Sequence, residues 1–256
     1  MYAHISEKCK IIAIANQKGG VGKTSATVNV GSILAARGKN VLVIDMDSQA
    51  NLTYSLSSVE HDENIYHALT GRVSYLPVCK ISENLDLVPA SLDLAQVEIE
   101  ISSQICREKI LDKLLKPIRD NYDFILIDCP PTLTLLTLNA LAASNEIIVP
   151  LTAEELPFKG LEMMNIFISQ IHDMLNPSVH LTGILINRWE SSTLSSQIEE
   201  KLRKTLGSLV FKTKIRKNIR IAEAPRESRN IVDYAPKSNG AKDYKAFVDE
   251  LLEILG

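Results

Sequence analysis

A glycine-rich stretch, residues 16–24, has the composition of a phosphate-binding loop. It ends in Gly22-Lys23-Thr24, like the pattern G-x-x-x-x-G-K-[ST], but Gln17 stands where that pattern begins with glycine. Glycines free the backbone to curl its N–H groups around phosphate oxygens, and a helix predicted to follow adds the positive end of its dipole. We therefore expect the nucleotide phosphates to be bound by Lys18, Gly19, Gly20, Val21, Gly22, Lys23, Thr24 and Ser25.

Three side chains have the chemistry to act on a bound phosphate. The Lys23 ammonium would neutralise terminal phosphates, and the Thr24 hydroxyl would hold Mg²⁺. Asp128 follows four apolar residues, so its carboxylate is expected at the carboxyl edge of a parallel sheet, where ligands bind in open α/β folds. There Asp128 would order a water on Mg²⁺; the alternative is that it caps the next helix.

Two further acids, Asp45 and Asp47, close another apolar run, Val41–Ile44. Because side chains alternate along a strand, residues two apart lie on the same side of it. Both carboxylates are therefore expected near the phosphate loop.

The elements that must position these residues alternate along the chain. Short apolar, β-branched runs are typical of strands buried on both faces of a parallel sheet. They predict strands at Ile11–Ala15, Val41–Ile44, Leu85–Val88, Phe124–Ile127, Glu146–Val149 and Leu181–Ile186. Helices are predicted at Thr24–Arg37, Leu92–Ile118, Leu133–Ala142, Gly160–Leu175, Leu194–Leu206 and Ala241–Leu255. This alternation predicts an α/β fold with a mostly parallel central sheet flanked by helices.

Composition limits the class of protein. The chain has 256 residues, of which 45% are hydrophobic and 23% charged, with a net charge of −3. No linker or repeat interrupts it, so we expect a single domain over residues 1–256, with residues 1–9 as a flexible end. It contains no apolar run of the length that a spanning helix needs, and its first ten residues lack the apolar core of a signal peptide, so we expect a cytoplasmic protein. The four cysteines form no C-x-x-C pair, which favours free thiols.

Several motifs together resemble a known family. The loop has the form K-G-G-x-G-K-T at residues 18–24, residues 45–51 have the form D-x-D-x-Q-x-N, and residues 128–131 have the form D-x-P-P. Residues 221–225 and 238–244 resemble the C-terminal segment of partition ATPases. The sequence thus resembles the ParA/Soj/MinD family of deviant Walker A ATPases over residues 10–255, and its ParA/Soj branch most. The resemblance implies a P-loop NTPase fold.

The resemblance also implies roles for individual residues. ATP with Mg²⁺ is the implied cofactor, and Asp47 positions the attacking water. Asp45 lies near the Mg²⁺ shell, with structural capping as its alternative role. Lys18 reaches across an ATP-dependent homodimer to the partner's phosphates, as an arginine finger does; its alternative is a solvated loop lysine. The implied catalytic residues are Lys18, Lys23 and Asp47, and the implied metal-binding residues are Thr24, Asp45 and Asp128.

Adenine contacts are implied at two places. Asn187 and Arg188 follow a predicted strand, where family members use an asparagine for the base edge, and Pro225 would pack on the base. Residues 186–189 are closer to the MinD pattern than to the threonine and aromatic residue of partition ATPases.

A basic stretch covers residues 201–220, which contain eight Lys and Arg and no acid and leave the other 236 residues at a charge of −11. Such segregation favours polyanion binding, and a solvated helix face balanced by Glu199 and Glu200 is the alternative. Aromatic residues are sparse, so duplex DNA bound through its phosphates, without sequence preference, fits best. The DNA contacts are expected at Arg216, Lys217 and Arg220.

These observations lead to a partition ATPase as the main hypothesis. It would dimerise on ATP, bind nonspecific double-stranded DNA on the nucleoid and be released by hydrolysis that a ParB/Spo0J-type partner stimulates. One alternative is a ParA-like ATPase that positions another cargo. A MinD-like membrane-surface ATPase needs a basic amphipathic C-terminal helix, whereas residues 249–256 are acidic, so no membrane partner is expected. An electron carrier like the nitrogenase iron protein needs a cysteine pair that Cys106 and Cys129 do not supply.

Overall fold

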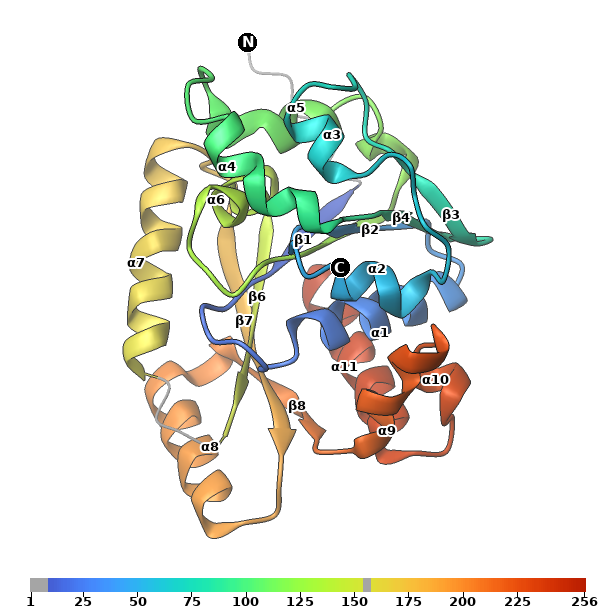
Figure 1. Ribbon diagram of the computed structural model, residues 1–256. Helices are drawn as coiled ribbons and strands as arrows, with labels where there is room; N and C mark the ends of the chain where they lie inside the picture. The colour runs from blue at the N-terminus through green and yellow to red at the C-terminus, as the bar shows by residue number, and fades with distance from the viewer. Residues whose placement is uncertain (1–8, 154–157) are drawn as a thin grey trace.

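A computed structural model describes residues 9–153 and 158–256. Its centre is an eight-stranded sheet in the order β3-β4-β2-β5-β1-β6-β7-β8, in which every neighbouring pair except β3–β4 is parallel (Figure 1). The strands are β1 Lys10–Ile14, β2 Val41–Asp45, β3 Cys79–Ser82, β4 Leu85–Val88, β5 Phe124–Asp128, β6 Glu146–Thr152, β7 His180–Trp189 and β8 Val210–Arg216. The predicted mostly parallel α/β fold is confirmed.

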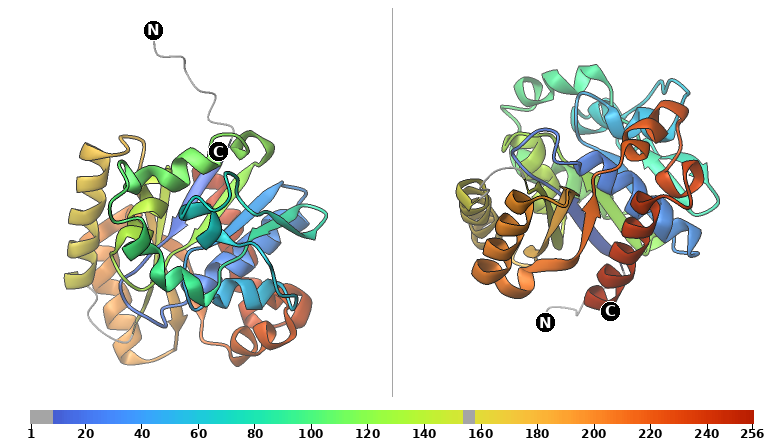
Figure 2. Two further views of the ribbon diagram at one scale, coloured as in Figure 1. Left: turned by 45° about the horizontal axis from the view of Figure 1, so that its top comes forward. Right: turned by 90° about the horizontal axis from the view of Figure 1, so that it is seen from below.

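Helices cover both faces of the sheet (Figure 2). Buried residues of α1 and α11 pack on one face, and those of α3, α5, α6, α7 and α8 pack on the other. The helices are α1 Lys23–Ala36, α2 Asn51–Leu56, α3 Ile65–Leu69, α4 Val97–Glu100, α5 Ile110–Leu115, α6 Leu135–Ala143, α7 Phe158–Met174, α8 Thr193–Leu206, α9 Ile219–Glu223, α10 Ile231–Tyr234 and α11 Asn239–Leu255. No helix in the described residues combines the length and apolar character needed to cross a membrane.

The middle of the sheet brings three loops to one edge. Every residue of β2 and β5 is buried, as expected of apolar strands with helices on both sides. Their register pairs Asp45 with Asp128, and the register of β1 and β5 pairs Ile14 with Asp128. The loop that follows β1 therefore begins beside both acids.

The strand predictions are confirmed for all six runs, and β6 and β7 extend three residues further at their carboxyl ends. The single helix predicted at Leu92–Ile118 is wrong. The chain forms the 3₁₀ helix η1 Leu92–Gln96, then α4, then η2 Arg107–Lys109 and α5, with a left-handed residue, Cys106, at φ +58° between α4 and η2. Breaking the helix lets both halves face the sheet and bury Leu94, Val97, Leu111 and Leu115.

Two strands were not predicted. β3 is a four-residue edge strand, and β8 lies inside the basic stretch, where Val210, Phe211 and Ile215 are buried between more exposed basic residues. The expected flexible end at residues 1–9 falls mainly on residues 1–8, which are outside the described chain. The single-domain assignment stays a prediction.

Candidate active site

The glycine-rich loop joins β1 to α1 and contains two left-handed glycines. Gly20 has φ +72°, and Gly22, which precedes the first residue of α1, has φ +91°. A Cβ on Gly22 would lie 2.0 Å from Asn187 Nδ2, so this position requires glycine for space as well as for conformation. The α1 N-terminus has no side-chain cap and no acid in its first turn, which leaves its N–H groups for an anion.

Lys23, the first residue of α1, is buried and lines the cavity beside the loop. Its ammonium donates a hydrogen bond to the Lys18 carbonyl oxygen at 3.3 Å. Burial lowers the pKa of Lys23, and the nearby Asp128 carboxylate opposes that shift. Lys18 is exposed, and its own N–H donates to Asn16 Oδ1 at 3.0 Å, which fixes the start of the loop.

Thr24 and Asp128 form the pair that a divalent cation would need. The Thr24 hydroxyl donates to Asp128 Oδ2 at 2.6 Å, while Oδ1 of the same buried carboxylate has no hydrogen-bond partner. Burial raises the pKa of Asp128 well above its usual range, and the adjacent Asp45 carboxylate adds to the shift. A hydroxyl and a partly unsatisfied carboxylate are the oxygen ligands that Mg²⁺ prefers, so these residues fit a magnesium ion.

The two acids that end β2 differ in their surroundings. Asp45 is fully buried; its Oδ2 accepts hydrogen bonds from Thr53 N at 2.9 Å and Thr53 Oγ1 at 2.7 Å, and its Oδ1 accepts from Asp47 N at 3.1 Å. Burial raises the pKa of Asp45 to about 6. These bonds give Asp45 the structural role of holding α2 and the Asp47 loop, and a contact with the metal shell stays a prediction. Asp47 is partly exposed and lines the cavity.

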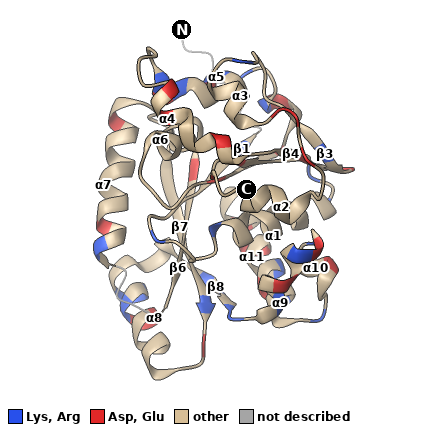
Figure 3. Ribbon diagram, viewed as in Figure 1, with Lys and Arg blue, Asp and Glu red and all other residues tan. Residues whose placement is uncertain are grey.

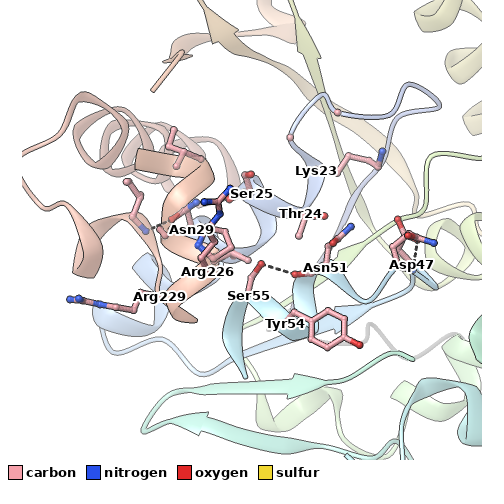
Figure 4. A pocket seen from close by; sticks show the side chains of 18 of the residues that line it. Lys23, Thr24, Ser25, Asn29, Asp47, Asn51, Tyr54, Ser55, Arg226 and Arg229 are labelled. Atoms are coloured by element: carbon pink, nitrogen blue, oxygen red, sulfur yellow. Dashed lines mark hydrogen bonds between the residues drawn. The ribbon is translucent and has the colours of Figure 1, made fainter. Parts of the chain in front are cut away.

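The cavity has a volume of about 570 Å³ and is formed by three segments far apart in the chain (Figure 4). The phosphate loop and α1 form one wall, Asp47 and α2 form the second, and residues 221–231 form the third. Of the predicted residues, the structure brings together Gly19, Gly20, Gly22, Lys23, Thr24, Ser25, Asp47 and Pro225. It also adds Asn29, Asn51, Tyr54, Arg226 and Arg229, which the sequence analysis missed. The only signal for the two arginines was the predicted Pro225, which Arg226 follows directly and Arg229 follows by four residues.

Asn187 and Arg188 lie at the end of β7, against the loop rather than in the cavity lining. Asn187 is buried, and its amide nitrogen donates to the Val21 carbonyl at 2.8 Å. Arg188, in the left-handed region with φ +53°, donates from Nη1 to the Gly20 carbonyl at 3.3 Å. Both residues thus support the loop from β7, and their contact with adenine stays a prediction.

The three predicted DNA-binding residues lie at the end of β8, directly after it and in α9, and each has an acidic partner. Arg216 donates from Nη2 to Asp243 Oδ1 at 2.6 Å and from Nε to Asp243 Oδ2 at 2.9 Å, which ties β8 to α11. Lys217 pairs with Glu190, and Arg220 pairs with Glu223 at 2.8 Å.

Two more residues of the basic stretch, Arg203 and Lys214, share one acidic partner. Glu199 accepts from Arg203 Nε at 3.1 Å and from Lys214 Nζ at 2.6 Å. Partial burial would raise the pKa of Glu199, but these hydrogen bonds outweigh it and lower the pKa. Acidic residues lie beside basic ones on α8 and α9, whereas the charged residues of β8 itself are only Lys and Arg (Figure 3). Five of the eight basic residues at 201–220 thus pair with acids, whereas the side chains of Lys201, Lys204 and Lys212 have no acidic partner among the described residues, and the DNA-binding surface stays a prediction.

A family model described as an AAA domain (AAA_31) matches residues 9–181. The chain is similar to the chromosome-partitioning ATPase Soj of Thermus thermophilus, with 38% identity over 248 residues, 96% of each chain.

Two solved structures share the fold over nearly the whole chain. The first is the cobyrinic acid a,c-diamide synthase of Mycobacterium smegmatis with a bound ATP analogue and magnesium. It superposes with a TM-score of 0.83 at 32% identity, covering 96% of this chain and 95% of the other. The second is the septum site-determining protein MinD of Pyrococcus horikoshii with Mg-ADP, at a TM-score of 0.80 and 25% identity, covering 97% and 98%.

Proposed function

The chain belongs to the family of ParA- and MinD-type P-loop ATPases, and from this premise we propose that it is a partition ATPase. In this proposal the protein binds ATP with Mg²⁺, dimerises, and binds DNA without sequence preference. Hydrolysis stimulated by a ParB-type partner then releases it from the DNA. The assignment to chromosome or plasmid partition follows its similarity to Soj, the chromosome-partitioning ATPase of Thermus thermophilus.

The observation that carries the proposal is the meeting of four groups at the carboxyl edge of β1, β2 and β5. The buried Lys23, the hydrogen-bonded pair of Thr24 and Asp128, and the cavity-lining Asp47 come from three separate strand ends. A phosphate loop with a buried cation, a magnesium-type oxygen pair and a free carboxylate is the set that phosphoryl transfer to water requires.

Each residue then has a defined task. Thr24 and Asp128 would hold Mg²⁺, which neutralises charge on the terminal phosphates when it is bound. Lys23 binds the same phosphates from the loop, and its low exposure strengthens that interaction because little water screens it. Asp47 orients the attacking water by accepting a hydrogen bond from it. We expect slow turnover by the isolated subunit, because Lys18, the cation predicted to act like an arginine finger, would come from a second subunit.

DNA binding would use the surface of β8, α8 and α9. Lys217 and Arg220 are paired with acids, but exposed ion pairs are worth only about 0–1 kcal/mol each, so DNA phosphates can compete for both residues. A dimer would present two such surfaces. Because each phosphate contact releases counterions, doubling the number of contacts raises affinity steeply.

Binding to a membrane through α11 is disfavoured. That helix buries Tyr244, Phe247, Val248 and Leu251 against the sheet, so its apolar face is already used in the fold. Its last turns also carry Asp249, Glu250 and Glu253, which anionic lipid would repel.

The proposal is tested by measuring ATP hydrolysis and DNA co-sedimentation of the purified protein. We expect slow Mg²⁺-dependent phosphate release, and DNA retention with ATP but not with ADP. Retention should be equal for DNA fragments of unrelated sequence. ATP hydrolysis without any DNA retention would instead favour a ParA-like ATPase that positions another cargo, and absence of both would refute the ATPase assignment.

A further inference from the structure

One arginine in the cavity wall has no acidic partner among the described residues. Arg226 belongs to the short 3₁₀ helix η5, Ala224–Glu227, and lines the cavity. Within residues 9–153 and 158–256 it makes no ion pair or side-chain hydrogen bond. Its neighbours do: Arg220 pairs with Glu223, and the Arg229 guanidinium donates to the Asp233 carbonyl. The charge of Arg226 is therefore available to an anion that enters the cavity.

The position of Arg226 indicates which part of a bound anion its guanidinium would contact. Figure 4 shows its side chain beside Ser25 and Asn29 of α1, away from Lys23. The Asn29 side chain is already bonded elsewhere: its Nδ2 donates to the Ser25 carbonyl at 2.7 Å and its Oδ1 accepts from Ile231 N at 2.8 Å. These bonds fasten the wall that carries Arg226 to the first turns of α1.

We propose that Arg226 is a nucleotide-binding residue that contacts the α-phosphate, and this assignment rests on the proposed function. If the terminal phosphates lie at Lys23 and Thr24, the next phosphate along α1 lies toward Ser25, which follows Thr24 directly. A guanidinium matches two phosphate oxygens with parallel N–H groups, and an ammonium does not. Arg226 would thus bind ATP and ADP equally, because both carry an α-phosphate.

The test compares ADP and ATP affinity in variants built on Asp47→Ala, which prevents turnover during the measurement. Arg226→Ala should weaken both nucleotides by the same factor, about tenfold, as expected for loss of a charge-assisted hydrogen bond. Arg226→Lys should recover part of that loss. Lys237→Ala removes an exposed cation from the same C-terminal region outside the cavity and should leave both affinities unchanged.

Three results would overturn the assignment. Unchanged ADP affinity in Arg226→Ala would refute the contact, and loss for ATP alone would place Arg226 at the γ-phosphate instead. Absence of nucleotide binding by the parent would refute the proposed function together with this assignment. Because Arg226 is exposed, we expect the thermal unfolding midpoint of Arg226→Ala to match the parent, so that any loss reports binding.

Discussion

Asp45 and Asp47 are separated by one residue, yet their carboxylates have different hydrogen-bond partners and different positions relative to the cavity. The Asp45 carboxylate accepts hydrogen bonds from Thr53 and from the N–H of Asp47, so it fixes the backbone that carries the Asp47 side chain. Asp47 accepts only the N–H of Gln49 among the described residues and borders the cavity. We therefore assign the activation of water to Asp47 and the positioning of that group to Asp45.

Replacement of Asp47 by alanine should separate binding from hydrolysis. Without the carboxylate no group orients the water, so Asp47→Ala should hydrolyse ATP about 100-fold more slowly while still binding it. Lys23→Ala, in contrast, should lose nucleotide binding, because it removes the buried cation. Phosphate release and equilibrium ATP binding measure the two effects, and hydrolysis at the parental rate by Asp47→Ala would disprove its role.

The exposed Lys18 is predicted to act on the phosphates of a second subunit. Lys18→Ala should therefore bind ATP nearly as the parent does, within about threefold, but dimerise and hydrolyse more weakly. Light scattering with a slowly hydrolysed ATP analogue measures the mass of the complex. Lys39→Ala, which removes another exposed lysine after α1, is the matched control. A Lys18→Ala protein that dimerises like the parent would exclude the action across the interface.

At the scale of elements, the phosphate loop and β7 are tied together at Gly22. Gly22→Ala should destabilise the fold and abolish ADP binding, because its Cβ would overlap Asn187, which is held on the Val21 carbonyl. Gly38→Ala is the control: that glycine is also left-handed, at φ +78°, but nothing lies within 4 Å of a Cβ. Gly38→Ala should lower the free energy of unfolding by about 1–3 kcal/mol through backbone strain, and Gly22→Ala should lower it by more than this. Thermal unfolding measures the difference, and equal losses would show that the contact with Asn187 does not matter.

The sequence predicted the elements whose signal is local. Strands such as β2 and β5 are apolar throughout, and the phosphate loop is recognised by its glycines and Lys23. β8 was missed because its strand pattern was hidden by the Lys and Arg residues that prompted a surface interpretation. The broken helix at residues 92–118 was missed because both halves have helical sequences, and only packing against the sheet forces the turn near Cys106.

In the candidate site, too, the residues with a local sequence signal were predicted and those placed by distant contacts were not. Lys23, Thr24 and Asp47 stand in motifs, whereas Asn29 and Arg226 lie just outside the motifs that the sequence analysis used. The bond from Ile231 N to Asn29 Oδ1 joins residues 202 positions apart, and sequence spacing alone cannot reveal such a contact. For the same reason the acidic partners of the basic stretch, such as Asp243 and Glu190, could not be foreseen.

At the scale of the whole molecule, these ion pairs change how DNA binding should be tested. Removing Arg216 would leave Asp243 without its partner at the contact of β8 with α11, so a loss of DNA binding there would be mixed with a loss of stability. Lys217 and Arg220 are more than half exposed and can be replaced with less damage.

Lys217→Gln with Arg220→Gln should weaken DNA binding in the presence of ATP, with ATP binding unchanged. Log affinity should fall linearly with log salt at about −0.9 per phosphate contact, and the slope should become shallower in this variant. Glu190→Gln is the control of opposite sign, because it frees Lys217 and should tighten binding. Fluorescence polarisation across a salt series, with ATP and with ADP, measures both. An unchanged slope in the double variant would move the DNA surface elsewhere.

The third wall of the cavity has a consequence for synthesis. Residues 221–231, which close the cavity, follow the phosphate loop by some 200 residues, so the ribosome makes them long after the loop. Contacts of such long sequence separation form late, because the chain between them must already be ordered. A nascent chain that ends before Ile221 would contain the phosphate loop but lack the third wall of the cavity. In the proposed function, the nascent chain therefore gains its complete nucleotide site only after residues 221–231 have left the ribosome.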